Sequence, residues 1–304
     1  MERFIASARA PSNLALIKYM GRKDDALRLP ANGSISMNLS GCLTTTTVEF
    51  STAFEKDSLS IDGNTENEKE STRAFAHLDR IRTLVGSDLR AKIESHNSFP
   101  RSTGLSSSSS GLAALTVAAL GAFGKKLSER EISILARMGS GSACRSIPDG
   151  FVEWLDGDTS ETSYGVSIFP PEHWDLCDVV AVVTKVPKVI PSSDTHLAVT
   201  QSPRFRPRLA EMAERIAACK EHLQNKDLSK LGPLVELESE DLHALYESVG
   251  IRQRSDKAME IVNMVPQWRT EIPVYYSLNT GQNVHLLCEG KDVEAVQKKL
   301  QAMP

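Results

Sequence analysis

Apolar and polar residues alternate along much of the first sixty residues. Over residues 34–39, Ile35, Met37 and Leu39 point to one side while serine and asparagine point to the other. This period of two predicts a strand with one buried face. Further strands are expected at residues 5–10 (ending at Pro11), 43–50, 59–63 and 89–95. The first sixty residues therefore predict antiparallel β structure.

A helical period takes over in the next part of the chain. Residues 66–85 place Phe75, Leu78 and Ile81 at helical spacing, and residues 111–123 form a strongly apolar helix. A further helix is expected from Leu127 to Met138. Ser128 and Glu131 have the spacing of a capping box at its start.

The second half changes from strands to helices near residue 190. Strands are expected at 151–154, 166–170 and 178–186, the last being β-branched enough to be central and buried and ending at Pro187. A loop at 188–195 follows. Helices are expected at 208–224, 228–248, 255–264 and 292–302, and a hairpin at 274–278 and 283–288. The shift predicts an α+β protein with two lobes and a site between them.

Composition narrows the class of protein. The chain has 304 residues, 40% of them hydrophobic and 24% charged, with a net charge of -4. We expect no nucleic-acid partner and no membrane partner, because there is no basic excess and no apolar run near the ~20 residues of a membrane helix. The N-terminus lacks a signal-peptide pattern, and the five cysteines form no CxxC pair. A cytoplasmic protein without disulfides or structural zinc is expected.

A serine-rich loop at residues 99–111 carries the strongest functional signal. It runs into the apolar helix, so free backbone N–H groups and the helix dipole would favour a phosphate chain there. The alternative is a serine-rich linker between domains. The loop contains neither a Walker A motif nor a GxGxxG fingerprint.

Two other small-residue loops, 139–146 and 279–283, accompany two cations, Lys18 and Arg145. Lys18 lies between Ile17 and Tyr19, where it either extends from an apolar strand toward solvent or is buried as a functional charge. Phosphate-binding loops together with fixed cations and hydroxyl ligands for Mg²⁺ indicate ATP-dependent phosphoryl transfer.

The motifs resemble a known family. The run from Pro100 to Ser109 looks like the phosphate-binding motif of the GHMP kinase superfamily. Residues 10–21 and 139–146 resemble diphosphomevalonate decarboxylase, as do 29–36 and 151–154. The resemblance implies a two-lobed GHMP kinase fold, with a ribosomal protein S5 domain 2-like N-terminal lobe and a ferredoxin-like C-terminal lobe. It implies an ATP-binding lobe over residues 1–188 and a substrate lobe over residues 189–304.

The implied reaction is ATP-dependent phosphorylation of the 3-hydroxyl of mevalonate 5-diphosphate, followed by loss of phosphate and CO₂ to give isopentenyl diphosphate. ATP and Mg²⁺ are the implied cofactors, and a homodimer is the family habit. The resemblance implies that Lys18, Ser108, Arg145 and the position of Asn279 are catalytic. ATP would be bound by Pro100, Gly104, Leu105, Ser106, Ser107, Ser108 and Ser109, with Ser107 and Ser108 also near Mg²⁺. The implied substrate contacts are Tyr19, Arg22, Lys69, Ser140, Ser142, Arg145, Ser192 and Ser193.

One position departs from the family motif. Asn279 stands where the family has its catalytic aspartate, and an amide cannot accept the hydroxyl proton at neutral pH. Three outcomes are open: full activity through positioning and metal, phosphorylation without decarboxylation, or a non-catalytic protein that binds ATP or metabolites. Asp149 and Asp194 are candidate substitute bases. The sequence Met20-Gly21-Arg22-Lys23 also differs from the family, so mevalonate 5-phosphate is an alternative substrate.

The remaining features have structural interpretations. The seven histidines show no metal-binding spacing, and His285 is expected to pack across a hairpin. The acidic run at 236–241 is expected to be a solvated helix face, with a smaller chance that it lines the substrate lobe. Cys144 is expected to be a packing residue rather than a nucleophile.

Overall fold

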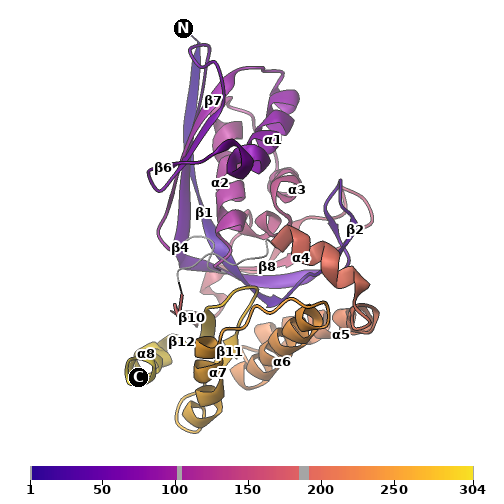
Figure 1. Cartoon of the computed structure of the whole chain (residues 1–304), viewed down its shortest axis with the longest axis vertical. Helices are drawn as coiled ribbons and strands as arrows, with labels where there is room; N and C mark the ends of the chain where they lie inside the picture. Colours follow the sequence, from indigo (N-terminus) through magenta and orange to yellow (C-terminus); the bar gives the residue numbers. More distant parts are fainter. Residues whose placement is uncertain (1, 101–104, 185–191, 304) are drawn as a thin grey trace.

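A long antiparallel pair of strands forms the spine of the protein. The computed structural model describes residues 2–100, 105–184 and 192–303. β1 (Arg3–Ile17) pairs with β4 (Ser34–Ser51), and β4 also pairs with strands on its other edge, so it lies at the centre of the larger sheet. Figure 1 shows these two strands running along the long axis of the molecule. The rest of this sheet comprises β5 (Ser58–Ile61), β6 (Asn64–Thr65), β7 (Arg90–Asn97), β8 (Phe151–Trp154) and β9 (Gly165–Phe169).

Helices cover one face of this sheet. α1 (Glu68–Val85), α2 (Ser107–Ala122) and α3 (Glu129–Gly139) lie beside one another in Figure 1. α2 is apolar on nearly every side, and its residues pack with Phe50, Leu78 and Ile81 in one hydrophobic core. The expected capping box begins α3: the Ser128 hydroxyl accepts the Glu131 N–H, and Glu131 accepts the Ser128 N–H. The helices predicted at 66–85 and 127–138 are thus confirmed.

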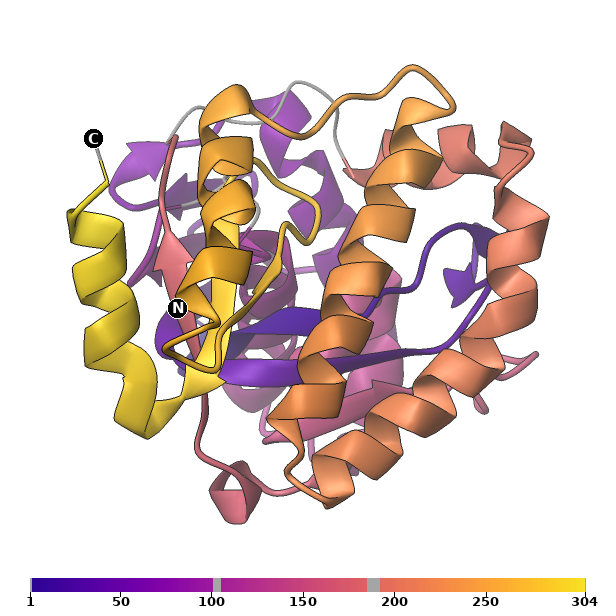
Figure 2. The ribbon, with the colours of Figure 1, turned by 90° about the horizontal axis from the view of Figure 1, so that it is seen from below.

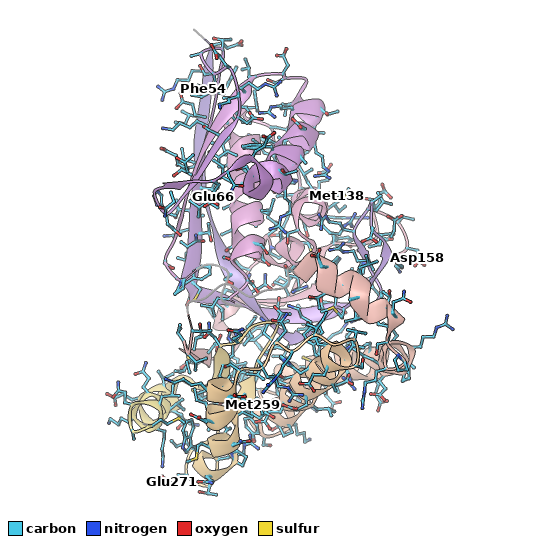
Figure 3. The ribbon with its side chains drawn as sticks, in the orientation of Figure 1. Phe54, Glu66, Met138, Asp158, Met259 and Glu271 are labelled. Carbon is cyan, nitrogen blue, oxygen red and sulfur yellow. The ribbon has the colours of Figure 1, made fainter. Side chains whose placement is uncertain are left out.

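A smaller sheet lies at the other end of the molecule. Its order is β10 (Leu176–Ala181), β12 (Val284–Glu289), β11 (Tyr275–Ser277), which confirms the predicted hairpin. In Figure 2, α8 (Val293–Gln301) lies on one side of this sheet and α6 (Leu228–Glu247) on the other. In Figure 3, Phe54 and Glu271 mark opposite ends of the long axis. The helices of this half are α4 (Ser192–Ala198), α5 (Phe205–Gln224), α6 (Leu228–Glu247), α7 (Asp256–Trp268) and α8 (Val293–Gln301).

A second hydrophobic core joins the two halves of the chain. Leu14, Leu16 and Met37 from the larger sheet pack in one cluster with residues of α5, α6 and the smaller sheet, including Leu231 and Leu287. Across the described residues, no helix has both the length and the apolar character needed to cross a membrane. Short elements complete the fold: β2 (Arg22–Asp24), β3 (Leu29–Pro30), η1 (Gly141–Ser146), η2 (Pro171–His173), η3 (Val199–Gln201) and η4 (Gly290–Asp292).

The first strand was expected to stop at Pro11, which is wrong. β1 continues to Ile17, and its register shifts between Pro11, opposite Leu43, and Ser12, opposite Leu39. Proline cannot donate to a sheet ladder, so it fits at such an irregularity. The continuation matters because it carries the chain from the first core to the second and delivers Lys18.

Three other expectations were wrong. Residues 178–186 were expected in a central, buried strand. In the structure β10 ends at Ala181 and is an edge strand with half-buried residues, and β12 is central. The helix after the serine-rich loop begins at Ser107 rather than Gly111, within the serine run. α4 begins at Ser192, inside the expected loop 188–195. The division of the chain at residue 188 falls outside the described residues and stays a prediction.

Candidate active site

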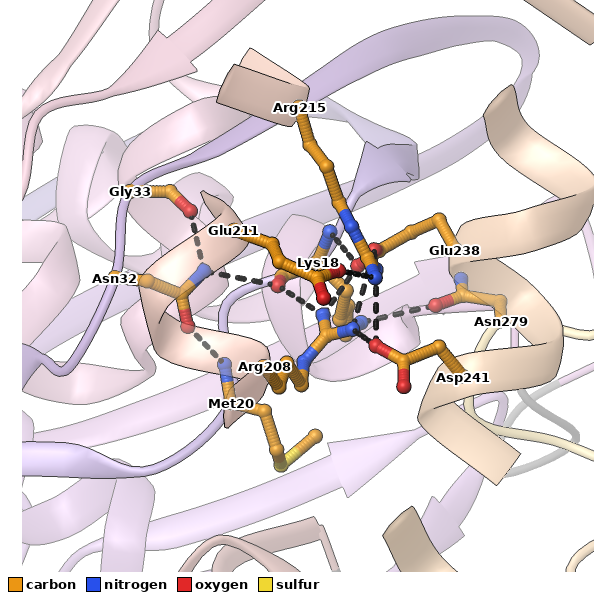
Figure 4. Close-up of polar contacts among 10 residues, drawn as sticks. All are labelled: Lys18, Met20, Asn32, Gly33, Arg208, Glu211, Arg215, Glu238, Asp241 and Asn279. Atoms are coloured by element: carbon orange, nitrogen blue, oxygen red, sulfur yellow. Dashed lines mark hydrogen bonds and ion pairs between the residues drawn. The ribbon is translucent and has the colours of Figure 1, made fainter. Parts of the chain in front are cut away.

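The ammonium group of Lys18 meets the amide of Asn279 where the two lobes come together. Lys18 follows the last residue of β1 and is only 7% exposed. Its Nζ donates a hydrogen bond of 2.9 Å to Asn279 Oδ1, shown in Figure 4. Of the two interpretations of Lys18, the structure supports the buried charge. A lysine and a residue 261 positions later are thus joined in one site.

Asn279 lies in a constrained turn after β11. Its φ is +48°, in the left-handed region that asparagine tolerates better than most residues. Its N–H donates to Ser277 Oγ at 3.1 Å, and the preceding Leu278 N–H donates to Ser239 Oγ at 3.0 Å. The Nδ2 of Asn279 is buried and has no hydrogen-bond partner in the described part of the chain. The turn therefore holds the amide with its oxygen toward Lys18.

Charged side chains from α5 and α6 surround the backbone of Lys18 (Figure 4). Glu238 Oε1 accepts the Lys18 N–H at 2.9 Å, and Arg208 Nη2 donates to the Lys18 carbonyl at 3.1 Å. Glu238 also pairs with Arg208 and Arg215. Burial alone would lower the pKa of Arg208, but Glu238 and Asp241 outweigh burial and raise that pKa. The expectation of a solvated face at 236–241 is wrong for Glu238, which is 3% exposed.

Arg145 is a fully buried cation in η1. Its guanidinium donates to Ser36 Oγ at 2.9 Å, Ser34 Oγ at 2.7 Å and Asn13 Oδ1 at 3.2 Å. All three acceptors are neutral, and among the described residues no carboxylate pairs with Arg145. Burial lowers the pKa of Arg145. Because only neutral groups hold this buried guanidinium, its positive charge is not neutralised and can bind the carboxylate or phosphate of a ligand.

The serine-rich loop lies against the 139–146 loop. The Ser109 and Ser142 hydroxyls are hydrogen-bonded to each other, and the Ser12 hydroxyl donates to the Leu105 carbonyl. Ser106 precedes α2 in the left-handed region and makes no side-chain cap. Ser108 is half-buried in the first turn of α2. The beginning of α2 thus combines the helix N-terminus with serine hydroxyls, an arrangement that favours an anion.

Aromatic and basic residues line the next part of the site. The Tyr19 ring stacks on His196, with centroids 4.5 Å apart, and meets the edge of Trp154. A Cβ on Gly141 would lie 2.6 Å from Tyr19 Oη, so only glycine fits there. Arg22 Nη1 pairs with Asp25 at 2.7 Å, while its Nε is buried without a partner in the described structure.

Two family models match the chain. One, described as the diphosphomevalonate decarboxylase-like N-terminal domain, matches residues 10–165. The other, described as the mevalonate 5-diphosphate decarboxylase C-terminal domain, matches residues 178–303. The chain belongs to the diphosphomevalonate decarboxylase family. This confirms the resemblance drawn from the sequence motifs.

Individual relatives agree with this membership. The chain is 36% identical to the diphosphomevalonate decarboxylase of Candida albicans over 300 residues, covering 92% of this chain and 83% of that one. It is 31% identical to the phosphomevalonate decarboxylase of Haloferax volcanii, covering 96% and 91%. A solved complex of MDDEF with MVAPP, the ATP analogue AMPPCP and magnesium superposes with a TM-score of 0.94 at 33% identity, covering 99% of this chain and 93% of that one. The two-lobed GHMP kinase fold is therefore confirmed, and members of the family bind an ATP analogue and magnesium.

Most predicted site residues of this family member lie in the described structure. Lys18 and Asn279 are in contact, and Ser109 contacts Ser142. Ser140 is buried at the end of α3. Pro100 and Ser107, within the serine-rich loop, are half-buried. Gly104 and the side chains of Lys69, Ser192 and Ser193 lie outside the described residues.

The candidate substitute bases Asp149 and Asp194 stay predictions, and both are exposed, unlike the buried Lys18. Asp149 is exposed and lines a separate groove with Arg9, Glu172 and Trp174. Asp194 is exposed on α4. Burial raises the pKa of the Cys144 thiol to about 12, as expected for a packing residue. Among the described residues, no group of three or more His, Cys, Asp or Glu could hold a metal ion.

Sequence reasoning missed Arg28 and Arg73, whose charges act together with that of Arg22. Burial lowers the pKa of Arg28, and the guanidinium groups of Arg22, Arg73 and Arg80 lower it further. Arg28 Nε donates to the Met138 carbonyl at 2.9 Å. These cations come from the β2–β3 hairpin and from α1. In the sequence, only the basic cluster of Arg22 and Lys23 indicated this site. An arginine in a helix, such as Arg73 in α1, usually lies on an exposed face, so its sequence position alone does not indicate a binding site.

Proposed function

We propose that this chain catalyses the ATP-dependent decarboxylation of mevalonate 5-diphosphate to isopentenyl diphosphate, as a carboxy-lyase of the mevalonate pathway. The fully buried Arg145 carries this proposal, because its neutral partners leave its charge available to a carboxylate. The family name and the MVAPP complex of MDDEF support the substrate.

The reaction has two stages. The γ-phosphoryl group of ATP passes to the 3-hydroxyl, the hydroxyl loses its proton and ADP departs. The C3–O bond then breaks with loss of phosphate. The electrons of the bond to the carboxylate form the C=C bond, and CO₂ leaves. Arg145 would hold the carboxylate until this step, and Lys18 would stabilise negative charge at the reacting centre.

The serine-rich loop would hold the nucleotide. Pro100, Gly104, Leu105 and the serines up to Ser109 would surround the phosphates, and α2 would present its first N–H groups. Mg²⁺ prefers oxygen ligands and takes several of them from phosphates and water, so it needs only a few from the protein. Ser107 and Ser108 would supply them. Magnesium would neutralise charge on the transferred phosphoryl group.

The two ends of the substrate would bind to different groups. Ser140, Ser142 and Arg145 would contact the end that carries the carboxylate. Tyr19, Arg22 and Lys69 would contact the 5-diphosphate, with Arg28 and Arg73 adding positive charge. Three arginines within electrostatic range favour a diphosphate over a single phosphate. Ser192 and Ser193 would close over the phosphates.

Because Asn279 replaces the family's catalytic aspartate, the decisive experiment asks which products the protein forms. The purified protein is incubated with Mg-ATP and mevalonate 5-diphosphate, and ADP and CO₂ are both measured. Equal amounts of the two products support the proposal. ADP without CO₂ would indicate a kinase that stops at the 3-phosphate, and neither product with intact nucleotide binding would indicate a binding protein.

The phosphomevalonate decarboxylase of Haloferax volcanii makes mevalonate 5-phosphate the second candidate substrate. The same assay run with that compound tests it, and we expect a lower kcat/KM than with the diphosphate. We also expect a homodimer, which analytical ultracentrifugation would test. The five cysteines are free, which supports a reducing cytoplasmic location.

A further inference from the structure

The acidic run of α6 contains one buried carboxylate, Glu238, that the reaction itself does not use. Glu238 accepts the Lys18 N–H at 2.9 Å and is 3% exposed. We propose that Glu238 is a positioning residue that fixes Lys18 for phosphoryl transfer and charge stabilisation. This inference rests on the function proposed above.

Lys18 needs such a partner because the strand ladder ends before it. The last registered pair of β1 and β4 is Ile17 with Ile35. Beyond that pair, Glu238 takes the Lys18 N–H, while Arg208 Nη2 and Asn32 Nδ2 each donate to the Lys18 carbonyl at 3.1 Å. Side chains, two of them from the other lobe, therefore replace the sheet in holding this peptide.

The same helix holds the residue that Lys18 contacts. Ser239 Oγ accepts the Leu278 N–H at 3.0 Å, and Glu236 Oε1 accepts the Tyr276 N–H at 3.1 Å. α6 thus fixes the backbone on both sides of the Lys18–Asn279 hydrogen bond. A shift of about 1 Å at a reacting group can cost 10²-fold in rate.

The charges around Glu238 explain why it acts through geometry. Arg208 and Arg215 both pair with Glu238 and with Asp241, and Arg215 also pairs with the more exposed Glu211. Both carboxylate oxygens of Glu238 are occupied, Oε1 by Lys18 and Arg208 and Oε2 by Arg208 and Arg215. Glutamine has one acceptor oxygen, so Glu238→Gln must lose one of these sets.

A matched control exists at the far end of the N-terminal lobe. Asp57 Oδ1 accepts the Ala91 N–H at 2.8 Å and pairs with the buried Arg82 at 2.5 Å. Asp57→Asn therefore removes the same kind of bonds away from the site. We expect similar losses of Tm for Asp57→Asn and Glu238→Gln. Only Glu238→Gln should lower kcat, by tenfold or more, with both KM values within threefold of the original.

A second measurement does not depend on turnover. Amide hydrogen exchange of the Lys18 N–H should become at least tenfold faster in Glu238→Gln and stay unchanged in Asp57→Asn. If the original protein releases no CO₂, the proposed function fails, while this exchange measurement still tests the positioning. Unchanged kcat and unchanged Lys18 exchange in Glu238→Gln would overturn the inference. So would kcat losses that follow Tm equally in both variants.

If Glu238→Gln does not fold, Glu238→Asp replaces it. It keeps the charge for the arginines but is one methylene shorter, so it should not reach the Lys18 N–H. We expect the same loss of kcat with a smaller loss of Tm. Original kcat in a folded Glu238→Asp protein would overturn the positioning role.

Discussion

Asn279→Asp would place a carboxylate against Lys18 with little other change. The asparagine oxygen already lies 2.9 Å from Lys18 Nζ, and both residue types tolerate the left-handed φ of +48°. The substitution also removes the buried Nδ2 that has no partner in the described structure. The variant therefore isolates the effect of a base and a negative charge at this position.

The magnitude follows from two opposing terms. At 2.9 Å and an effective dielectric constant of about 20, the attraction between the new carboxylate and Lys18 is about 6 kcal/mol. Burying the carboxylate costs several kcal/mol, so the two terms nearly cancel and the free energy of unfolding should change by less than about 2 kcal/mol. A positioned general base contributes about 10²–10⁴-fold in rate.

We accordingly expect kcat for CO₂ release to rise at least a hundredfold in Asn279→Asp. Its pH–rate profile should gain an acidic limb, where the new carboxyl is protonated, that the original protein lacks. Release of CO₂ from carboxyl-labelled substrate measures both, and Asn279→Ala is the control. A folded Asn279→Asp protein with unchanged kcat would refute the reasoning, because the reaction would then not be limited by a base at this position.

Three further outcomes are expected. Arg145→Gln should lower CO₂ release at least a hundredfold while ADP formation falls less, because the carboxylate loses its cation; equal losses would contradict the assignment. Gly141→Ala would bring a Cβ within 2.6 Å of Tyr19 Oη, so kcat/KM should fall tenfold and stability by about 1–3 kcal/mol in urea unfolding. Burial lowers the pKa of His77 and of His243 from 6.5 to about 3. Below pH 6.5 these histidines are protonated in the unfolded chain but stay neutral in the folded protein, so the free energy of unfolding falls as the pH falls. At pH 5 the loss should be about 2 kcal/mol for each histidine, and His77→Gln should remove its share.

Local motifs made much of the site predictable. The serine-rich loop, the 139–146 loop and Lys18 could be recognised because their composition is unusual for ordinary helices and strands. The functional position of Asn279 came from the resemblance to the family motif, because its local sequence alone indicates only a turn in a hairpin. The contact between Lys18 and Asn279 needed the family resemblance, since 261 positions separate the two residues in the sequence.

The surroundings of the site could not be predicted in the same way. Glu238 belongs to a run of acids, a composition typical of an exposed face. Its burial depends on Arg208 and Arg215, which lie 30 and 23 positions earlier in α5. Pro11 looked like a strand end, and only the register shift opposite Leu43 lets β1 continue. In both cases, contacts with residues distant in the sequence determined the structure, and the local sequence pattern predicted a different one.

The core shared by Leu14, Met37, Met212, Leu231 and Leu287 limits how this protein can be divided. A chain cut between β9 and β10 would expose this apolar surface on both fragments, so neither should fold alone and each should aggregate unless the other is present. Chimaeras that exchange the C-terminal half with a relative would have to carry matching residues on β1 and β4. Unfolding should accordingly be one cooperative event, with the nucleotide-binding and substrate-binding regions lost together.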